Sequence, residues 1–69
     1  MSKTIDARGL SCPQPLILAT RAMKDLGAFE IIVDNAVARE NIVRMLTDRY
    51  SITPDVREAG LDITIRVDR

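Results

Sequence analysis

The stretch Leu61-Asp62-Ile63-Thr64-Ile65-Arg66-Val67-Asp68 decides the fold, because apolar and polar residues alternate along it without a break. Successive side chains of a strand point to opposite faces of a sheet, so the pattern predicts a strand with one buried and one solvated face. The residues expected to point inward are Leu61, Ile63, Ile65 and Val67. A sheet with one solvated face needs a covering layer on the other face only.

Three further strands are predicted upstream of this stretch. They are Thr4 to Ala7, Phe29 to Val33 and about Pro54 to Ala59, and all are short segments with apolar content. Gly60 separates the third of them from the alternating stretch and predicts a turn, which makes the last two strands an antiparallel hairpin.

Two amphipathic helices account for the rest of the chain. The first is expected from Pro13 to about Leu26, ending at Gly27, with a buried stripe of Pro15, Leu16, Ala19, Ala22, Met23 and Leu26. The second is expected from about Ala36 to Tyr50, capped by Asp34 or Asn35. Its buried stripe is Ala38, Ile42, Met45 and Leu46, with Val43 and Tyr50 at the margin.

The predicted order is therefore β-α-β-α-β-β, and the fold class is α/β. The economical arrangement is a two-layer sandwich in which two helices pack on one face of a four-stranded mixed sheet. Each β-α-β crossover is expected to be right-handed. At 69 residues the chain is expected to form a single domain spanning residues 1–69.

The composition narrows the classes of function. Apolar residues make up 46% of the chain and charged residues 29%, which is typical of a globular domain. Ten basic residues balance ten acidic ones, which argues against nucleic acid as a partner because phosphate binding usually needs a basic excess. No apolar run is long enough for a membrane span. One cysteine and no export signal favour a cytoplasmic location.

Metal and cofactor sites are not predicted. The chain has one cysteine and no histidine, so it offers no set of metal ligands with the usual spacing and no histidine base for a catalytic triad. Gly9, Gly27 and Gly60 lie too far apart to form a phosphate-binding loop.

The candidate site is Gly9-Leu10-Ser11-Cys12-Pro13-Gln14-Pro15, which holds the only cysteine. Pro13 suits the first position of a helix, which makes Cys12 the predicted N-cap. The positive end of the helix dipole favours a thiolate there. Pro13 and Pro15 have no N–H to bind that anion, so we expect only partial activation. The alternative from the residues alone is that Cys12 is a small buried hydrophobic residue.

Three neighbouring residues bear on whether Cys12 is a reactive thiol or a buried hydrophobic residue. Pro15 stands where a Cys-x-x-Cys motif would have its second thiol, so Cys12 has no internal partner and fits a carrier better than a reductase. Ile17 points away from the buried stripe, one turn from Cys12, and is a candidate for partner docking. Arg8 is a second docking candidate and the nearest cation to the thiol, and pairing with Asp6 is its alternative role.

The ten residues Asp6-Ala7-Arg8-Gly9-Leu10-Ser11-Cys12-Pro13-Gln14-Pro15 closely resemble the opening of the TusA/SirA/YedF family of small sulfur carriers, whose hallmark is Cys-Pro-x-Pro. The resemblance covers essentially the whole chain. Val33-Asp34-Asn35, followed by Arg39-Glu40-Asn41, looks most like the YedF-type branch, which is associated with selenium metabolism. Gln14 is a departure, because well-understood sulfur-relay members often have Glu there. YedF-type proteins usually continue into a DsrE-like domain, which this sequence lacks.

The resemblance implies a two-layer α/β sandwich and a persulfide carried on Cys12, with Pro13, Gln14 and Pro15 shaping the helix entry. It also implies two protein partners: a sulfur donor, either a cysteine desulfurase or a rhodanese-like protein, and a downstream protein with an acceptor thiol. Two alternatives stay open. The first alternative to a sulfur carrier is a non-catalytic module that binds protein or RNA. The second is a carrier that uses the same cysteine for selenium.

Overall fold

The structure is a computed structural model that describes residues 3–10, 14–25 and 28–67. Its elements follow the predicted order: β1 (Lys3–Asp6), α1 (Gln14–Asp25), β2 (Phe29–Val33), α2 (Ala36–Tyr50), β3 (Asp55–Ala59) and β4 (Asp62–Val67). The strands form one sheet in the order β1-β2-β4-β3. β1 and β2 are parallel, whereas β4 is antiparallel to both β2 and β3, so the sheet is mixed as predicted.

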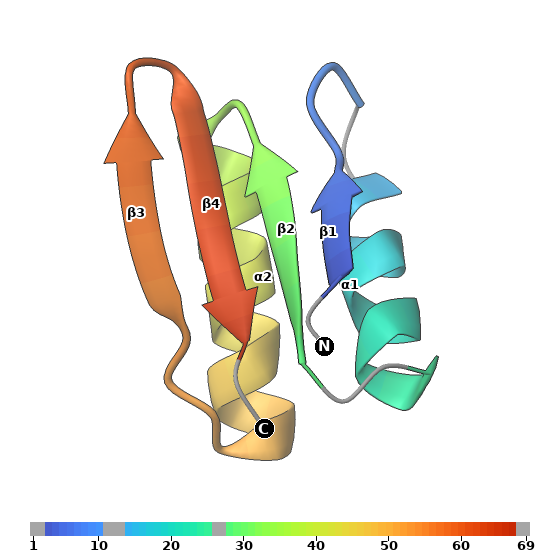
Figure 1. The fold of residues 1–69 in the computed structure, drawn as a ribbon. Coiled ribbons are helices and arrows are strands. Elements are labelled where there is room, and N and C mark those ends of the chain that lie inside the picture. Colours follow the sequence, from blue (N-terminus) through green and yellow to red (C-terminus); the bar gives the residue numbers. More distant parts are fainter. Residues whose placement is uncertain (1–2, 11–13, 26–27, 68–69) are drawn as a thin grey trace.

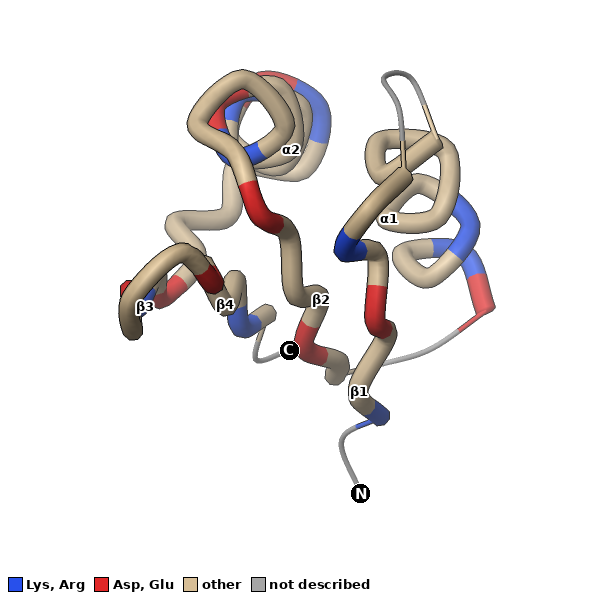
Figure 2. Tube along the Cα trace, turned by 90° about the horizontal axis from the view of Figure 1, so that it is seen from above, with Lys and Arg blue, Asp and Glu red and all other residues tan. Residues whose placement is uncertain are grey.

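Both helices lie on the same face of the sheet, which confirms the two-layer arrangement (Figures 1 and 2). The chain passes behind the sheet through α1 between β1 and β2, and through α2 between β2 and β3, with a right-handed crossover each time (Figure 1). The last two strands form the predicted antiparallel hairpin.

The core lies between the helices and the two central strands. Alternate residues of β2 and β4 point toward the helices and are fully or almost fully buried: Phe29, Ile31, Val33, Ile63, Ile65 and Val67. The helices contribute Ala19, Ala22 and Met23 from α1, and Ala38, Ile42, Met45 and Leu46 from α2. Each large apolar side chain buried in this way stabilises the fold by about 1.5–3 kcal/mol. The predicted buried stripes are therefore confirmed over the described residues, with Leu16 packing only partly buried against the core.

The prediction that Leu61 points into the core is wrong. Ala59 pairs with Asp62 in the hairpin, so Gly60 and Leu61 form the turn between the strands and β4 begins at Asp62. Gly60 has a positive φ of 64°, which suits glycine, and Leu61 is 85% exposed. The alternation predicted for β4 therefore holds only from Asp62 onward.

The two ends of α2 are closed by local hydrogen bonds. Asn35 is the N-cap, and its side-chain oxygen accepts a hydrogen bond from the Ala38 N–H at 2.8 Å. Ser51 takes the left-handed conformation at the other end, where the Ser51 N–H donates to the Thr47 carbonyl. For α1, the predicted end residues Pro13, Leu26 and Gly27 lie outside the described residues.

No helix within residues 3–10, 14–25 and 28–67 has both the length and the apolar character that crossing a membrane requires.

Candidate functional site

The described residues that flank the cysteine motif lie at one end of the molecule. Because β1 and β2 are parallel, their carboxyl ends meet at the same edge of the sheet. The starts of α1 and α2 and the turn between β3 and β4 lie at this end as well (Figure 1). Cys12 and Pro13 lie outside the described residues, so the site is built here from the residues on either side of them.

Residues 7–10, which we call the motif loop, continue directly from β1. The Ala7 N–H donates to the Ile32 carbonyl at 2.9 Å, and Ala7 is buried, so the loop starts from a fixed point on β2. Leu10 N–H then reaches back to the Ala7 carbonyl at 3.4 Å. This tight reversal places Gly9 at φ 77°, a left-handed conformation that glycine adopts without the strain other residues would meet.

The Gly9 amide is held by a carboxylate from the neighbouring strand. Its N–H donates to Asp34 Oδ2 at 2.9 Å, and Asp34 follows β2 directly. Asp34 therefore connects the end of β2 to the motif loop across a separation of 25 residues in sequence.

Arg8 binds two further carboxylates. Its Nε and one terminal nitrogen donate to the two oxygens of Asp6, each at 2.9 Å, and its other terminal nitrogen donates to Asp62 Oδ2 at 3.1 Å. The Arg8 backbone N–H also donates to Asp6 Oδ1 at 3.1 Å. The Asp6 pairing that the sequence left as an alternative is therefore present, together with a second partner.

This cluster shifts both pKa values in the direction that strengthens the charges. The side-chain hydrogen bonds from Arg8, followed by its backbone N–H, lower the pKa of Asp6 to about 2. The same contacts, led by the Asp6 hydrogen bonds, raise the pKa of Arg8 further above its ordinary range. The side chains are 46% and 56% exposed, so solvent screens the pair and its contribution to the stability of the fold is small.

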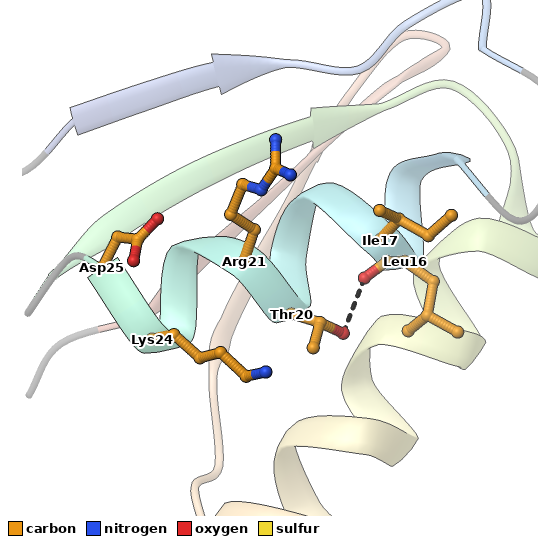
Figure 3. A pocket seen from close by; sticks show the side chains of 6 residues that line it. All are labelled: Leu16, Ile17, Thr20, Arg21, Lys24 and Asp25. Carbon is orange, nitrogen blue, oxygen red and sulfur yellow. Dashed lines mark hydrogen bonds between the residues drawn. The ribbon is translucent and has the colours of Figure 1, made fainter.

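The first turns of α1 place the rest of the motif. Gln14 is exposed, whereas Pro15 is buried against the core. Ile17 is 50% exposed, as its position off the buried stripe predicted. A groove of about 410 Å³ runs along this side of α1 from Leu16 and Ile17 to Lys24 and Asp25 (Figure 3). Its apolar end therefore lies nearest the motif.

Exposed apolar residues gather at the same end of the molecule. Among the described residues, the large hydrophobic side chains with high exposure are Leu10, Ile17, Val37 and Leu61. They belong to the motif loop, the first turns of α1 and α2, and the turn between β3 and β4. All of these lie at the end of the molecule where β1 and β2 terminate, which we call the site end (Figure 1). Large apolar side chains exposed at the end of the molecule that holds a site are a candidate surface for contact with another protein.

Asp34 and Asp62 are the residues that sequence reasoning missed. From the sequence, Asp34 is predicted as a helix cap and belongs to the stretch that resembles the YedF-type branch, and Asp62 is predicted on the solvated face of its strand. A topological signal was available for Asp34 alone, since residues that follow two adjacent parallel strands, here β1 and β2, meet at one end of the sheet. In the described part of the chain, no group of three or more His, Cys, Asp or Glu side chains is placed to hold a metal ion.

Comparisons with known proteins agree with this architecture. A solved structure of a SirA-like protein from Desulfitobacterium hafniense superposes with a TM-score of 0.76 at 28% sequence identity, covering 97% of this chain and 99% of that chain. A comparison with curated proteins finds no match. The family profile described as sulfurtransferase TusA matches residues 3–68, which is nearly the whole sequence. The chain therefore belongs to the TusA family of sulfurtransferases.

Proposed function

We propose that the protein is a sulfur carrier that holds sulfane sulfur as a persulfide on Cys12 and passes it to a thiol of a partner protein. The observation that carries the proposal is that a chain of this sulfurtransferase family contains a single cysteine. Sulfur transfer through a protein persulfide needs a thiolate, and Cys12 is the residue that supplies one. Such a relay also needs a reducing compartment, so we place it in the cytoplasm.

The transfer balances without an outside oxidant or reductant. The Cys12 thiolate attacks the outer sulfur of a persulfide on the donor protein, the donor's S–S bond breaks, and the donor cysteine leaves as a thiolate. Cys12 then carries the S–SH group. In the second half, a thiolate of the acceptor attacks that outer sulfur and Cys12 is released as a thiolate. Each step exchanges one S–S bond for another.

The absence of a second cysteine in the sequence supports a carrier over a reductase. A second thiol would let the chain release the sulfur itself by closing an internal disulfide, and Pro15 stands at the position where that thiol would be. Moderate activation of Cys12 is sufficient for this role, because the donor delivers a sulfur that is already activated.

Docking of the donor and the acceptor is proposed at the site end of the molecule. Leu10 precedes the Cys12-Pro13-Gln14-Pro15 segment and Ile17 follows it, and they expose 37% and 50% of their surface. An apolar contact there would bring a partner's reactive sulfur to the motif and exclude water from the exchange. Arg8 remains a candidate contact beside this surface, because its side chain is still 46% exposed while bonded to Asp6 and Asp62.

The direct test is mass spectrometry after incubation with a cysteine desulfurase and cysteine. We expect a mass increase of one sulfur atom that is removed by dithiothreitol and is absent in Cys12→Ala. A wild-type protein that never gains this mass, or a Cys12→Ala variant that does, overturns the proposal and favours a non-catalytic binding module.

Selenium is a second candidate cargo, favoured by the resemblance of Val33-Asp34-Asn35 and Arg39-Glu40-Asn41 to the YedF-type branch. The same thiolate would carry a selenium atom in place of sulfur. Loading by a desulfurase that is given equal cysteine and selenocysteine separates the two, because the Cys12 thiolate then attacks the outer sulfur or selenium on the donor cysteine, which leaves as a thiolate, and a selenium carrier gains predominantly the heavier atom.

A further inference from the structure

Three carboxylates from three neighbouring strands contact the motif loop. Asp6 ends β1, Asp34 follows β2, and Asp62 begins β4. Val33 pairs with Ile63, so Asp34 and Asp62 occupy the next positions of adjacent strands at the same end of the sheet. The three side chains thus lie at the same end of the sheet, although 56 residues separate the first from the last in sequence.

Each of these carboxylates accepts hydrogen bonds from the motif loop, and the donors belong to two consecutive residues, Arg8 and Gly9. Asp6 and Asp62 bind the Arg8 guanidinium, and Asp34 binds the Gly9 N–H. β1 and β4 flank β2, so Arg8 bridges two strands that lie roughly 10 Å apart. Like charges at one edge repel each other, and the donors of the loop offset this repulsion. The loop is therefore held to the sheet at several points, none of which is strong alone.

We infer that Asp34 is a positioning residue for sulfur transfer, because it accepts the Gly9 N–H and, with the Arg8–Asp62 ion pair, holds the motif loop against the end of the sheet. Leu10 precedes Cys12 by two residues, so at most about 7 Å of chain separates their Cα atoms. Fixing the loop thus limits where the thiol can be presented to a partner. The inference rests on the proposed function, since it assigns Asp34 a part in that same transfer.

The first arm of the test measures the loop itself and does not depend on sulfur chemistry. Hydrogen exchange of the Gly9 amide is followed by NMR in the wild type, Asp34→Ala, Asp34→Asn and a control, Asp48→Ala, which removes an exposed carboxylate near the other end of α2. We expect exchange to accelerate about three- to tenfold in Asp34→Ala. Asp34→Asn keeps an acceptor oxygen and should stay near the wild type, as should Asp48→Ala.

The second arm measures transfer from a persulfidated desulfurase to each folded variant. We expect the rate to fall about three- to tenfold in Asp34→Ala and to recover in Asp34→Asn, with Asp48→Ala unchanged. Transfer at the wild-type rate in Asp34→Ala, or an equal loss in Asp34→Ala and Asp34→Asn, overturns the inference. Arg8→Met removes the Arg8–Asp62 ion pair, which is the other contact that holds the motif loop, and is also expected to slow transfer.

The two arms separate this inference from the proposed function. If the wild type takes no sulfur, the proposed function fails, whereas the Gly9 amide still reports whether Asp34 holds the loop. If the wild type takes sulfur but Gly9 exchange is the same in Asp34→Ala, the carrier role stands and the positioning role of Asp34 is wrong.

Discussion

The starts of the two helices lie at the same end of the molecule and are built in different ways. α2 begins with a local cap, in which the Asn35 side chain accepts from the Ala38 N–H. The sequence around the start of α1 instead contains Pro13 and Pro15, which have no N–H to donate, and the motif loop before it is held by the carboxylates of Asp6, Asp34 and Asp62. The start of α2 is therefore held by a local hydrogen bond, whereas the motif loop that precedes α1 is held by tertiary contacts.

Asp34 and Asn35 show this division most closely, because they are adjacent in sequence. The Asn35 side-chain oxygen accepts from its own helix while its Nδ2 donates to Asp34 Oδ1 at 3.3 Å, and Asp34 turns its other oxygen, Oδ2, toward the motif loop. Their chemistry is similar but their partners differ. A residue type at a helix start therefore does not reveal its role until its partner is known.

The largest expected effect distinguishes two isoleucines, one in each helix. Ile42 of α2 is fully buried, so Ile42→Ala should lower the free energy of unfolding by about 2–5 kcal/mol. Thermal and urea unfolding measure this loss. Transfer by the fraction that remains folded should be unchanged, and a selective loss of transfer would contradict the division between the helices.

The matched change in α1 is Ile17→Ala. Because Ile17 is half exposed, we expect a change in stability within about 0.5 kcal/mol. Loss of an apolar contact should instead slow sulfur transfer from the donor several-fold, measured with donor below saturation. Ile17→Asp should slow it further. Equal transfer rates in all three proteins would remove Ile17 from the docking surface.

The next largest effect on stability is expected from removing the N-cap of α2. Asn35→Ala should lower the free energy of unfolding by about 1 kcal/mol, because the Ala38 N–H loses its partner. In a domain of this size that corresponds to a fall of about 4–8 °C in Tm. Asn35→Asp keeps a cap and is the control. A loss of transfer in Asn35→Ala that exceeds its loss of folded protein would show that the two helix starts are not independent.

The smallest expected effect is on the pH dependence of stability. The Asp6 pKa is lowered from 3.8 to about 2 in the folded state, so its pairing with Arg8 stabilises the fold above pH 3.8 and is lost as the pH falls toward 2. The difference in stability between the wild type and Asp6→Asn should therefore shrink over this interval. Urea unfolding at several pH values measures it, and a difference that stays constant down to pH 2 contradicts the shift.

Most of this fold could be predicted because the spacing of apolar residues along the sequence indicates which side chains are buried. The alternation in β4 and the stripe Ala38, Ile42, Met45 and Leu46 each identify one buried face, and the structure confirms both. Leu61 was misplaced because a two-residue turn removed it from the alternation, and a pattern of apolar residues carries no information on where a hairpin reverses.

The site was only partly predictable. Gly9 and Ile17 could be singled out from local rules, since one needs a permissive backbone and the other departs from a helical stripe. The contacts of Asp34 and Asp62 depend on which strands are neighbours, and β4 lies between β2 and β3 rather than at an edge. That order follows from the packing of the whole chain, so no local pattern could indicate that these two residues reach the motif loop.

The most direct test of the sulfur-carrier role follows radioactive sulfur from a loaded donor, through this protein, to a protein with an acceptor thiol. We predict that the wild type gains the label in amounts up to one sulfur per chain and loses it when the acceptor is added, while Cys12→Ser neither gains nor passes it. The account is contradicted if label reaches the acceptor equally fast with Cys12→Ser, or if the wild type never carries it.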